Sequence, residues 1–305
     1  NFNLSLCKQR FFDNFLNNCI KIRFIGFAHS YTKQYSFFQL SFNETIYRIV
    51  DMRNKVETRL KKCKKGGKTA IFLLVDSENF SSTSSVEKMA KDLLNASKNM
   101  KNLFPVILVG GSSATDQMGM DRAVRILRKK TKLPIVLFPG NITGVVPKAH
   151  AILFTSLMNS ENPYYITQAQ ALGAPLVRKM KLEALPTAYL IIGEGTSAWF
   201  FGNARGIPFD KPKIAAAYAM AAQYMGMRFV YLEAGSGAKQ NVTPEMVQTV
   251  RSVFDGFLMV GGGIRSAKTA NSLIKAGADG LVIGTLLEQT NGLKKFTEMV
   301  KSIQK

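Results

Sequence analysis

The sequence predicts an α/β protein that folds as a (β/α)₈, or TIM, barrel. Apolar runs of strand length recur after Met52, and a segment with helical signals follows nearly every one. Continuous apolar runs are typical of parallel strands that are buried on both faces. Regular alternation of strand and helix implies parallel pairing with right-handed crossovers. Eight such units in roughly 240 residues match a closed barrel better than an open sheet.

The expected strands alternate with helical segments along the chain, beginning with TAIFLLVD. They are Thr69–Asp76, Phe104–Ser113, Pro134–Gly140, His150–Leu157, Pro186–Gly193, Arg228–Gly235, Phe257–Ile264 and Gly280–Thr285.

The helices between these strands are marked by capping signals. Ser84 and Glu87 have the spacing of a capping box. Thr243 precedes Pro244 as N-cap and first-turn proline, and a further helix is expected within Ser266–Gly277. The third unit is the exception, because residues 141–149 (NITGVVPKA) are too short and proline-bearing for a full helix. We therefore expect a barrel with a degenerate third helix.

Residues 1–51 differ in character from residues 52–305, which we predict to form a single barrel domain. They hold nine of the 21 phenylalanines and show no strand–helix rhythm. One interpretation is an upstream extension of the reading frame, with Met52 as the natural start. The other is an amphipathic arm that contacts a membrane or a partner. We favour the first.

The net charge of +21 allows nucleic acid, anionic lipid surfaces or polyphosphate substrates as partners. The cations concentrate in Arg59–Lys68 and Arg125–Lys132. No recognised RNA- or DNA-binding motif accompanies them, so we expect no nucleic-acid partner. Peripheral contact with an anionic membrane is one interpretation of the two runs, and an ordinary solvated face is the other.

Targeting signals are lacking in the sequence. No apolar segment reaches the roughly 18 residues of a membrane-spanning helix, and no secretion signal is present. Cys7, Cys19 and Cys63 form no CxxC pair. We expect a soluble protein of the reducing cytoplasm.

Glycines end the last three expected strands: GSG at Gly235–Gly237, GGG at Gly261–Gly263, and the pair Gly284-Thr285. Backbone N–H groups in such loops approach an anion without a Cβ in the way. The loops after strands seven and eight of TIM barrels commonly hold phosphate. Three successive loops favour a phosphate site over simple tight turns.

Two carboxylates stand at strand ends where the mouth of the barrel is expected. Asp76 ends the first strand, opposite the hydroxyls of GGSS at the end of the second. This pairing suits Mg²⁺, although a helix cap is an open alternative for Asp76. Glu233 alternates with Tyr231, which directs it to the barrel interior, where an unpaired carboxylate is costly and usually functional.

Several ordered motifs together carry a family resemblance. YLEAGSGA, VGGGIRS, VGGS, LFTSLMNSENPYYI, PTAYLI and AAQYMGM resemble the geranylgeranylglyceryl phosphate synthase family, across Thr69–Glu288. Residues 1–51 resemble nothing in that family. The resemblance implies a Mg²⁺-dependent (β/α)₈ prenyltransferase that joins the 3-hydroxyl of sn-glycerol 1-phosphate to geranylgeranyl diphosphate, the first ether-forming step of archaeal membrane lipids. It also implies a homo-oligomer.

The resemblance also implies roles for individual residues. Glu233 and Tyr231 are the implied catalytic residues, and Asp76 and Ser112 the implied Mg²⁺ ligands. The glycerol-phosphate site falls on Tyr231, Leu232, Glu233, Ala234, Gly235, Ser236, Gly237, Gly262, Gly263, Gly284 and Thr285.

The chain departs from the family pattern at two places. Asp76-Ser77-Glu78 replaces the usual Asp-Pro-Asp, which leaves open whether Glu78 joins the metal, and Thr285 replaces the usual asparagine.

The residues support a prenyl-transfer chemistry without excluding others. Glu233 would accept the glycerol hydroxyl proton, while Tyr164, Tyr165 and Trp199 line a prenyl groove or simply pack. A synthase with another prenyl length, or a different phosphate-binding barrel enzyme, fits the glycine loops equally. A long apolar groove would distinguish a prenyltransferase from a sugar-phosphate enzyme.

Overall fold

The computed structural model of the 305-residue chain describes residues 55–76, 82–100, 102–111, 117–288 and 291–303. The predicted extension, residues 1–51, lies outside the described residues. So do Glu78 and Ser112, two of the side chains considered for the metal site. The boundary placed at Met52 therefore stays a prediction.

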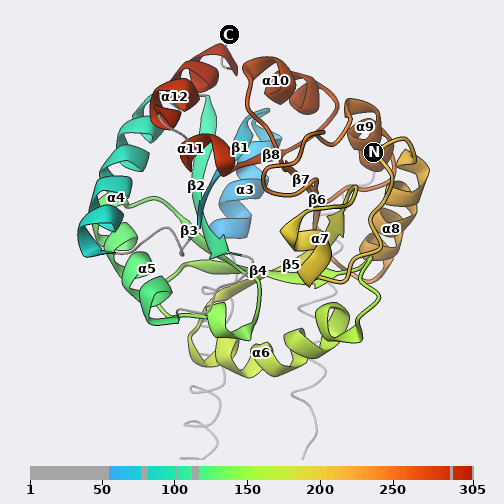
Figure 1. The fold of residues 1–305 in the computed structure, drawn as a ribbon, viewed down its shortest axis with the longest axis horizontal. Helices are drawn as coiled ribbons and strands as arrows, with labels where there is room; N and C mark the ends of the chain where they lie inside the picture. The colour runs from blue at the N-terminus through green and yellow to red at the C-terminus, as the bar shows by residue number, and fades with distance from the viewer. Residues whose placement is uncertain (1–54, 77–81, 101, 112–116, 289–290, 304–305) are drawn as a thin grey trace, which may run out of the picture. The chain divides into compact units, whose positions relative to one another are not determined.

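Eight parallel strands form a closed barrel in the order β1-β2-β3-β4-β5-β6-β7-β8, which confirms the predicted fold class (Figure 1). Each strand pairs with its sequence neighbours, and β8 closes the ring by pairing with β1. The strands are β1 Thr69–Asp76, β2 Leu103–Gly111, β3 Ile135–Pro139, β4 Ala151–Leu157, β5 Glu183–Ile191, β6 Phe229–Glu233, β7 Phe257–Gly261 and β8 Gly280–Ile283.

Helices surround this ring and cover its outer face (Figure 1). The α-helices are α3 Lys55–Lys65, α4 Thr83–Lys98, α5 Gln117–Thr131, α6 Ala169–Lys179, α7 Ser197–Phe201, α8 Pro212–Tyr224, α9 Pro244–Arg251, α10 Ala267–Lys275, α11 Thr285–Glu288 and α12 Gly292–Ile303. A 3₁₀ turn, η2 (Ile142–Gly144), and a π-helical turn, η3 (Tyr164–Gln168), complete the elements described. Among these residues, no helix is both long and apolar enough to cross a membrane.

The start of α4 differs from the capping box predicted at Ser84 and Glu87, which is wrong. Ser82 is the N-cap: its backbone is extended and its hydroxyl accepts a hydrogen bond from the Ser85 N–H at 3.2 Å. Ser85 completes the box through its own side chain. Glu87 lies farther along the helix and pairs with Lys130 of α5 at 3.1 Å. Several serines in a row offered equivalent caps, and the sequence did not distinguish among them.

The degenerate third unit is confirmed, and it opens the barrel wall. Only the turn η2 stands between β3 and β4, where the other units carry a helix. β3 and β4 pair through two registered residue pairs, Val136↔Ala151 and Leu137↔Ile152, whereas β4 and β5 share seven. The upper part of β4 is therefore paired on one side only.

Helix α3 closes the end of the barrel where the strands begin. Val56, Leu60 and Cys63 are buried in the same apolar cluster as the inward-facing strand residues. The Glu183 carboxylate accepts hydrogen bonds from the N–H groups of Val56 at 2.7 Å and Glu57 at 3.1 Å. These contacts satisfy two of the backbone donors that a helix leaves unpaired at its start.

An ion pair fixes the same helix. The Arg228 guanidinium donates two hydrogen bonds to the Glu57 carboxylate, at 2.7 and 2.9 Å, and Lys61 adds a third contact at 2.7 Å. Burial opposes ionisation of Glu57, but these two cations outweigh it and hold its pKa below the ordinary value. The basic run Arg59–Lys68 thus lies at the end of the barrel opposite the mouth.

Candidate active site

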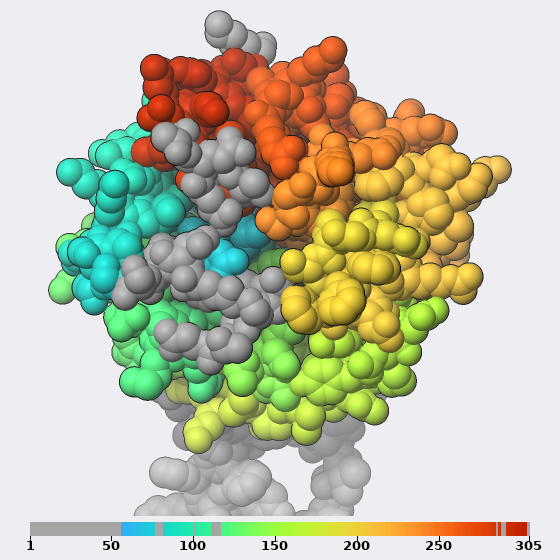
Figure 2. All heavy atoms as spheres, viewed as in Figure 1, coloured from blue at the N-terminus to red at the C-terminus, as the bar shows by residue number. Residues whose placement is uncertain are grey.

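A cavity of about 410 Å³ opens at the carboxyl-terminal ends of the strands. Figure 2 views this end of the barrel, with the yellow atoms of the α7 region bordering its centre. The cavity has two parts: a polar mouth inside the barrel, and an apolar branch that leaves the barrel between β3 and β4.

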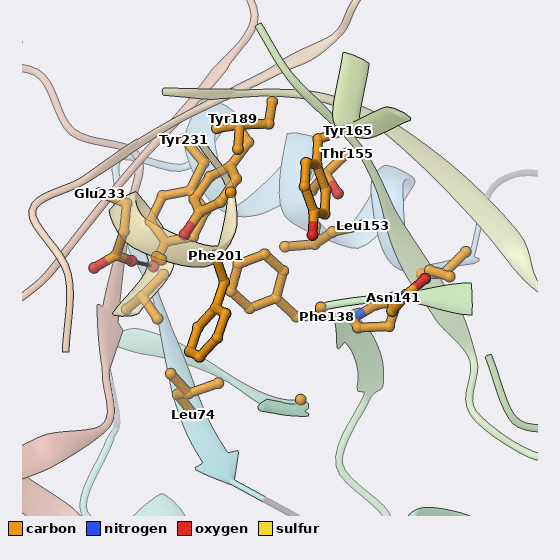
Figure 3. A pocket seen from close by; sticks show the side chains of 18 of the residues that line it. Leu74, Phe138, Asn141, Leu153, Thr155, Tyr165, Tyr189, Phe201, Tyr231 and Glu233 are labelled. Carbon is orange, nitrogen blue, oxygen red and sulfur yellow. Dashed lines mark hydrogen bonds between the residues drawn. The ribbon is translucent and has the colours of Figure 1, made fainter. Parts of the chain in front are cut away.

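Glu233 is the buried carboxylate of the mouth. It ends β6, is 6% exposed, and lines the cavity. One oxygen accepts the hydroxyl hydrogen of Tyr231 (Figure 3). The other accepts the Gly235 N–H at 2.7 Å. Burial raises the pKa of Glu233 above its ordinary value, although these two hydrogen bonds lower it in part. A carboxylate with a raised pKa is suited to accept a proton near neutral pH.

Aromatic rings form the floor beside this carboxylate. Figure 3 shows Tyr189 next to Tyr231, and their ring centroids are 5.2 Å apart. Phe138 packs against both, with centroids at 5.4 Å from Tyr189 and 5.6 Å from Tyr231. Burial, together with the nearby Glu233 charge, raises the pKa of both phenols well above 10. Both tyrosines therefore keep their protons and remain hydrogen-bond donors.

The loops after β6 and β7 lie backbone to backbone. Gly262 has φ +89°, and a Cβ added there would stand 2.7 Å from the N atoms of Ala234 and Gly235. Only glycine fits such a close approach. Asn241 donates a hydrogen bond to the Gly262 carbonyl at 2.7 Å and fixes this loop. The arrangement brings backbone of two loops to one side of the mouth, as expected for an anion cradle.

Asp76 lines the cavity from the end of β1, beside Gly110 of β2. The pairing Asp76↔Gly110 places the end of β2 next to it. A single carboxylate at an open mouth fits Mg²⁺, which usually takes one or two carboxylates and completes its shell with water and substrate phosphate oxygens. Ser112 follows Gly111 in sequence but lies outside the described residues.

The apolar branch runs along the outer side of β4. Leu153 faces into the barrel and packs in the apolar cluster inside it, here called the inner core. Ile152 faces outward and packs in the cluster between strands and helices, here called the outer core. Both residues line the same cavity. Gly173 and Val177 of α6 form its other side, with Val145 nearby. The cavity therefore passes through the wall where β3 and β4 part and continues under α6.

The structure brings most of the predicted site residues together. Those that line the cavity are Asp76, Tyr231, Glu233, Ser236, Gly262, Gly263 and Gly284. The Leu232 side chain lies in the outer core, so only its main chain faces the site. Ala234, Gly235 and Gly237 contribute backbone near it without lining the cavity. Thr285 is the first residue of α11, and its side chain is not among those that the structure describes.

Of the three aromatic residues proposed for a prenyl groove, one lines the cavity and two do not. Tyr165 lines the cavity (Figure 3), whereas Tyr164 donates a hydrogen bond to Asn141 at 2.6 Å. Trp199 packs in a small cluster with Leu157. Phe201, two residues on, lines the cavity in its place.

Sequence reasoning missed Tyr189, Phe138 and the α6 residues of the branch. Alternation along PTAYLI, with Leu185 and Thr187 before it, could have placed Tyr189 inside the barrel. Nothing in the sequence signals that Gly173 and Val177 face a cavity rather than a packed core.

The fold and this site together define a (β/α)₈-barrel enzyme, with a buried base and an anion cradle at its mouth and an apolar channel at its side. Residues 85–304 match the PcrB family, and the chain belongs to that family. This confirms the resemblance drawn from the motifs.

Named relatives are similar over most of their length. The geranylgeranylglyceryl phosphate synthase of Nitrosopumilus maritimus is 64% identical over 252 residues, covering 83% of this chain and 98% of that protein. That of Thermococcus kodakarensis is 44% identical over 234 residues, covering 77% and 90%.

A solved structure is similar in both fold and sequence. The (S)-3-O-geranylgeranylglyceryl phosphate synthase of Thermoplasma acidophilum, in complex with its substrate sn-glycerol-1-phosphate, superposes with a TM-score of 0.75 at 36% identity. The match covers 82% of this chain and 98% of that one.

Proposed function

We propose that this protein is a prenyltransferase that joins the 3-hydroxyl of sn-glycerol 1-phosphate to geranylgeranyl diphosphate. The products are geranylgeranylglyceryl phosphate and diphosphate. The observation that carries the proposal is the two-part cavity. A polar mouth suits a small phosphorylated acceptor, and an apolar branch suits a long hydrocarbon chain.

The acceptor would bind with its phosphate toward the loops after β6, β7 and β8. Ser236, Gly262, Gly263 and Gly284 line this side of the mouth. Their N–H groups and the Ser236 hydroxyl are donors suited to phosphate oxygens. The glycerol hydroxyls then point toward Glu233, on the strand that carries the first of these loops.

Glu233 would act as the base. As the hydroxyl oxygen forms its bond to the first carbon of the prenyl chain, its proton passes to the Glu233 carboxylate. The carbon–oxygen bond to diphosphate breaks, and its electron pair leaves with the diphosphate. Tyr231 and the Gly235 N–H hold the carboxylate in one orientation, so both reacting groups are positioned before reaction.

Mg²⁺ is the cofactor that we propose, with Asp76 as its ligand in the described part of the chain. Bound there, it would neutralise negative charge that develops on the departing diphosphate. Ser112 completes the proposed ligand pair.

The prenyl chain would occupy the apolar branch. The residues that would contact it are Ile152, Tyr165, Gly173, Val177 and Phe201, all of which line the cavity. This branch also argues against the rival function, a barrel enzyme for sugar or heterocycle phosphates, because such a substrate has no group to fill it.

Incubation of the purified protein with sn-glycerol 1-phosphate and prenyl diphosphates of several lengths, with and without Mg²⁺, tests the function. Gly173→Phe should fill the branch, so turnover of geranylgeranyl diphosphate should fall at least tenfold while shorter donors are retained. Gly173→Ala is the matched control, because an added Cβ meets only Ile142 Cγ2, at 3.9 Å. Equal chain-length profiles in the two variants would contradict this placement of the prenyl chain.

A further inference from the structure

One group of exposed cations at the end of the barrel opposite the mouth is separate in sequence from the run Arg59–Lys68. They lie at the turns before β3, β4 and β5 and are all exposed: Arg128, Lys129, Lys132, Lys148, Arg178, Lys179 and Lys181. We call this set the basic rim. The segments 128–133, 146–150 and 177–182 contain no aspartate or glutamate. Among the described residues, none of these seven cations forms an ion pair with an acidic side chain.

Several other cations of the two basic runs are paired within the fold. Lys61 pairs with Glu57, and Lys64 with Asp279. Arg125 pairs with Asp121 within α5. These contacts explain part of the basic runs as fastening of helices. Arg59, Lys62, Lys65 and Lys68 stay exposed at the same end of the barrel, and the basic rim is the part of this charge that lies beside the apolar branch.

The backbone of the basic rim indicates that its lysines have a role beyond the fold. Lys132, Lys148 and Lys181 have φ of +58°, +73° and +56°. This left-handed conformation strains any residue with a Cβ.

Glycine occupies the comparable turn position elsewhere in the barrel. Gly67, Gly226 and Gly277 precede β1, β6 and β8 with φ of +65°, +81° and +108°. Three successive turns thus hold a lysine where glycine would relieve the strain.

The apolar branch of the cavity ends beside the basic rim. Val177 lines the branch in the last turn of α6, and the next two residues are Arg178 and Lys179. Val145 lines it three residues before Lys148, whose carbonyl accepts a hydrogen bond from Arg128 at 2.6 Å. The far end of the branch and the cations thus share one region of the surface.

The outer face of α6 next to this region is apolar. Leu172 is 59% exposed, and Ala171, Ala174 and Pro175 are also exposed. Leu172, Pro175 and Lys179 follow one another at helical spacing, so the helix presents an apolar stripe that ends in cations. Apolar and basic side chains side by side are the pattern of contact with a membrane interface.

We propose that the basic rim and the α6 stripe dock this protein on an anionic lipid bilayer. The mouth then faces water, where the acceptor is, while the tail end of the prenyl branch lies at the membrane. The proposal rests on the proposed function only in assigning the branch to a prenyl chain. The charged surface itself is independent of it.

Vesicle co-sedimentation of the full chain tests the proposal without substrates. Phosphatidylcholine vesicles are compared with an equal mixture of phosphatidylcholine and phosphatidylglycerol, at low and high salt. The variant K132G/K148G/K181G removes three cations and relieves the left-handed strain. Each lysine near an anionic surface raises the membrane partition coefficient about fivefold. Loss of three should therefore lower binding of this variant to anionic vesicles on the order of 100-fold. Its thermal midpoint should not fall, because glycine accepts each conformation.

The control K213Q/K268Q/K294Q removes three exposed cations from the starts of α8, α10 and α12, at the mouth end. It should bind vesicles as the unmodified chain does. Equal binding to neutral and anionic vesicles, absence of binding, or a greater loss in the control would overturn the proposal. Light scattering tests whether this surface binds a second copy of the chain instead of a membrane. A change of oligomeric mass in the lysine variant would show that it does.

Prenyl transfer is measured separately in vesicle-free solution. There the lysine variant should match the unmodified chain, so a failed docking test and a failed function are told apart.

Discussion

Removal of the Tyr231 hydroxyl tests whether Glu233 acts as the base. In Tyr231→Phe the ring keeps its packing against Phe138 and Tyr189, but the hydrogen bond to the carboxylate is lost. That bond stabilises the ionised form of Glu233, so its loss raises the pKa further.

The size of the shift follows from the strength of the bond. A hydrogen bond to a charged group contributes about 1.5–3 kcal/mol, and one pKa unit corresponds to about 1.4 kcal/mol. Glu233 is buried, so solvent screens this interaction little. We therefore expect the ionised form of Glu233 to lose about 1.5–3 kcal/mol of stabilisation and its pKa to rise.

The direction in which the rate changes with pH follows from the role of Glu233 as a base. A protonated carboxyl cannot accept the glycerol hydroxyl proton, so the rate falls as pH drops through the pKa of Glu233. The acid limb of kcat/KM for sn-glycerol 1-phosphate should therefore move to higher pH in Tyr231→Phe. The measurement is a rate profile from about pH 5 to about pH 9.

Tyr189→Phe is the matched control. It removes a phenol hydroxyl from the same aromatic floor, and the described contacts include no hydrogen bond from Tyr189 to Glu233. Its acid limb should stay close to that of the unmodified enzyme. An unmoved limb in Tyr231→Phe, or an equal shift in both variants, would refute the assignment of Glu233 as the base.

Three further changes test other parts of the molecule. Asp76→Asn keeps the shape but loses the ligand charge, so Mg²⁺-dependent turnover should fall by about 100-fold or more, with an unchanged thermal midpoint; unaltered Mg²⁺ dependence would remove Asp76 as a ligand. Gly262→Ala places a Cβ against the N atoms of Ala234 and Gly235, so KM for sn-glycerol 1-phosphate should rise about tenfold, and an unchanged KM would argue against the cradle. A chain that starts at Met52 retains α3 and all eight strands, so its activity and melting temperature should be nearly unchanged, and a large loss of either would show that the first 51 residues support the barrel.

Much of the barrel could be predicted from local patterns. The runs from Thr69 and Phe257 are apolar throughout, as strands buried on both faces must be, and the observed strands begin at those residues. The boundaries of other strands differ from the expected ones by a few residues. β6 ends at Glu233 rather than Gly235, where the backbone leaves the extended conformation with φ of +98°.

The position of Glu233 was also accessible from the sequence. Side chains alternate along a strand, so Tyr231 and Glu233 had to face the same side, and the glycines beyond placed them at the strand end. The structure adds what the alternation does not contain: the two side chains bond to each other, and Tyr189 of the neighbouring strand lies beside them.

The sequence by itself determined the period of the strands, the glycines at their ends and the family of the chain, because each of these depends on residues close together along it. The tertiary structure alone decided the apolar branch, the role of α3 and the gathering of cations at one end. Those features depend on closure of the ring. The branch leaves the barrel between β3 and β4, which no full helix connects, and Lys132, Lys148 and Lys181 lie at neighbouring turns because three consecutive strands start side by side. Such neighbours are set by register and packing across the barrel, which no local pattern of side chains encodes.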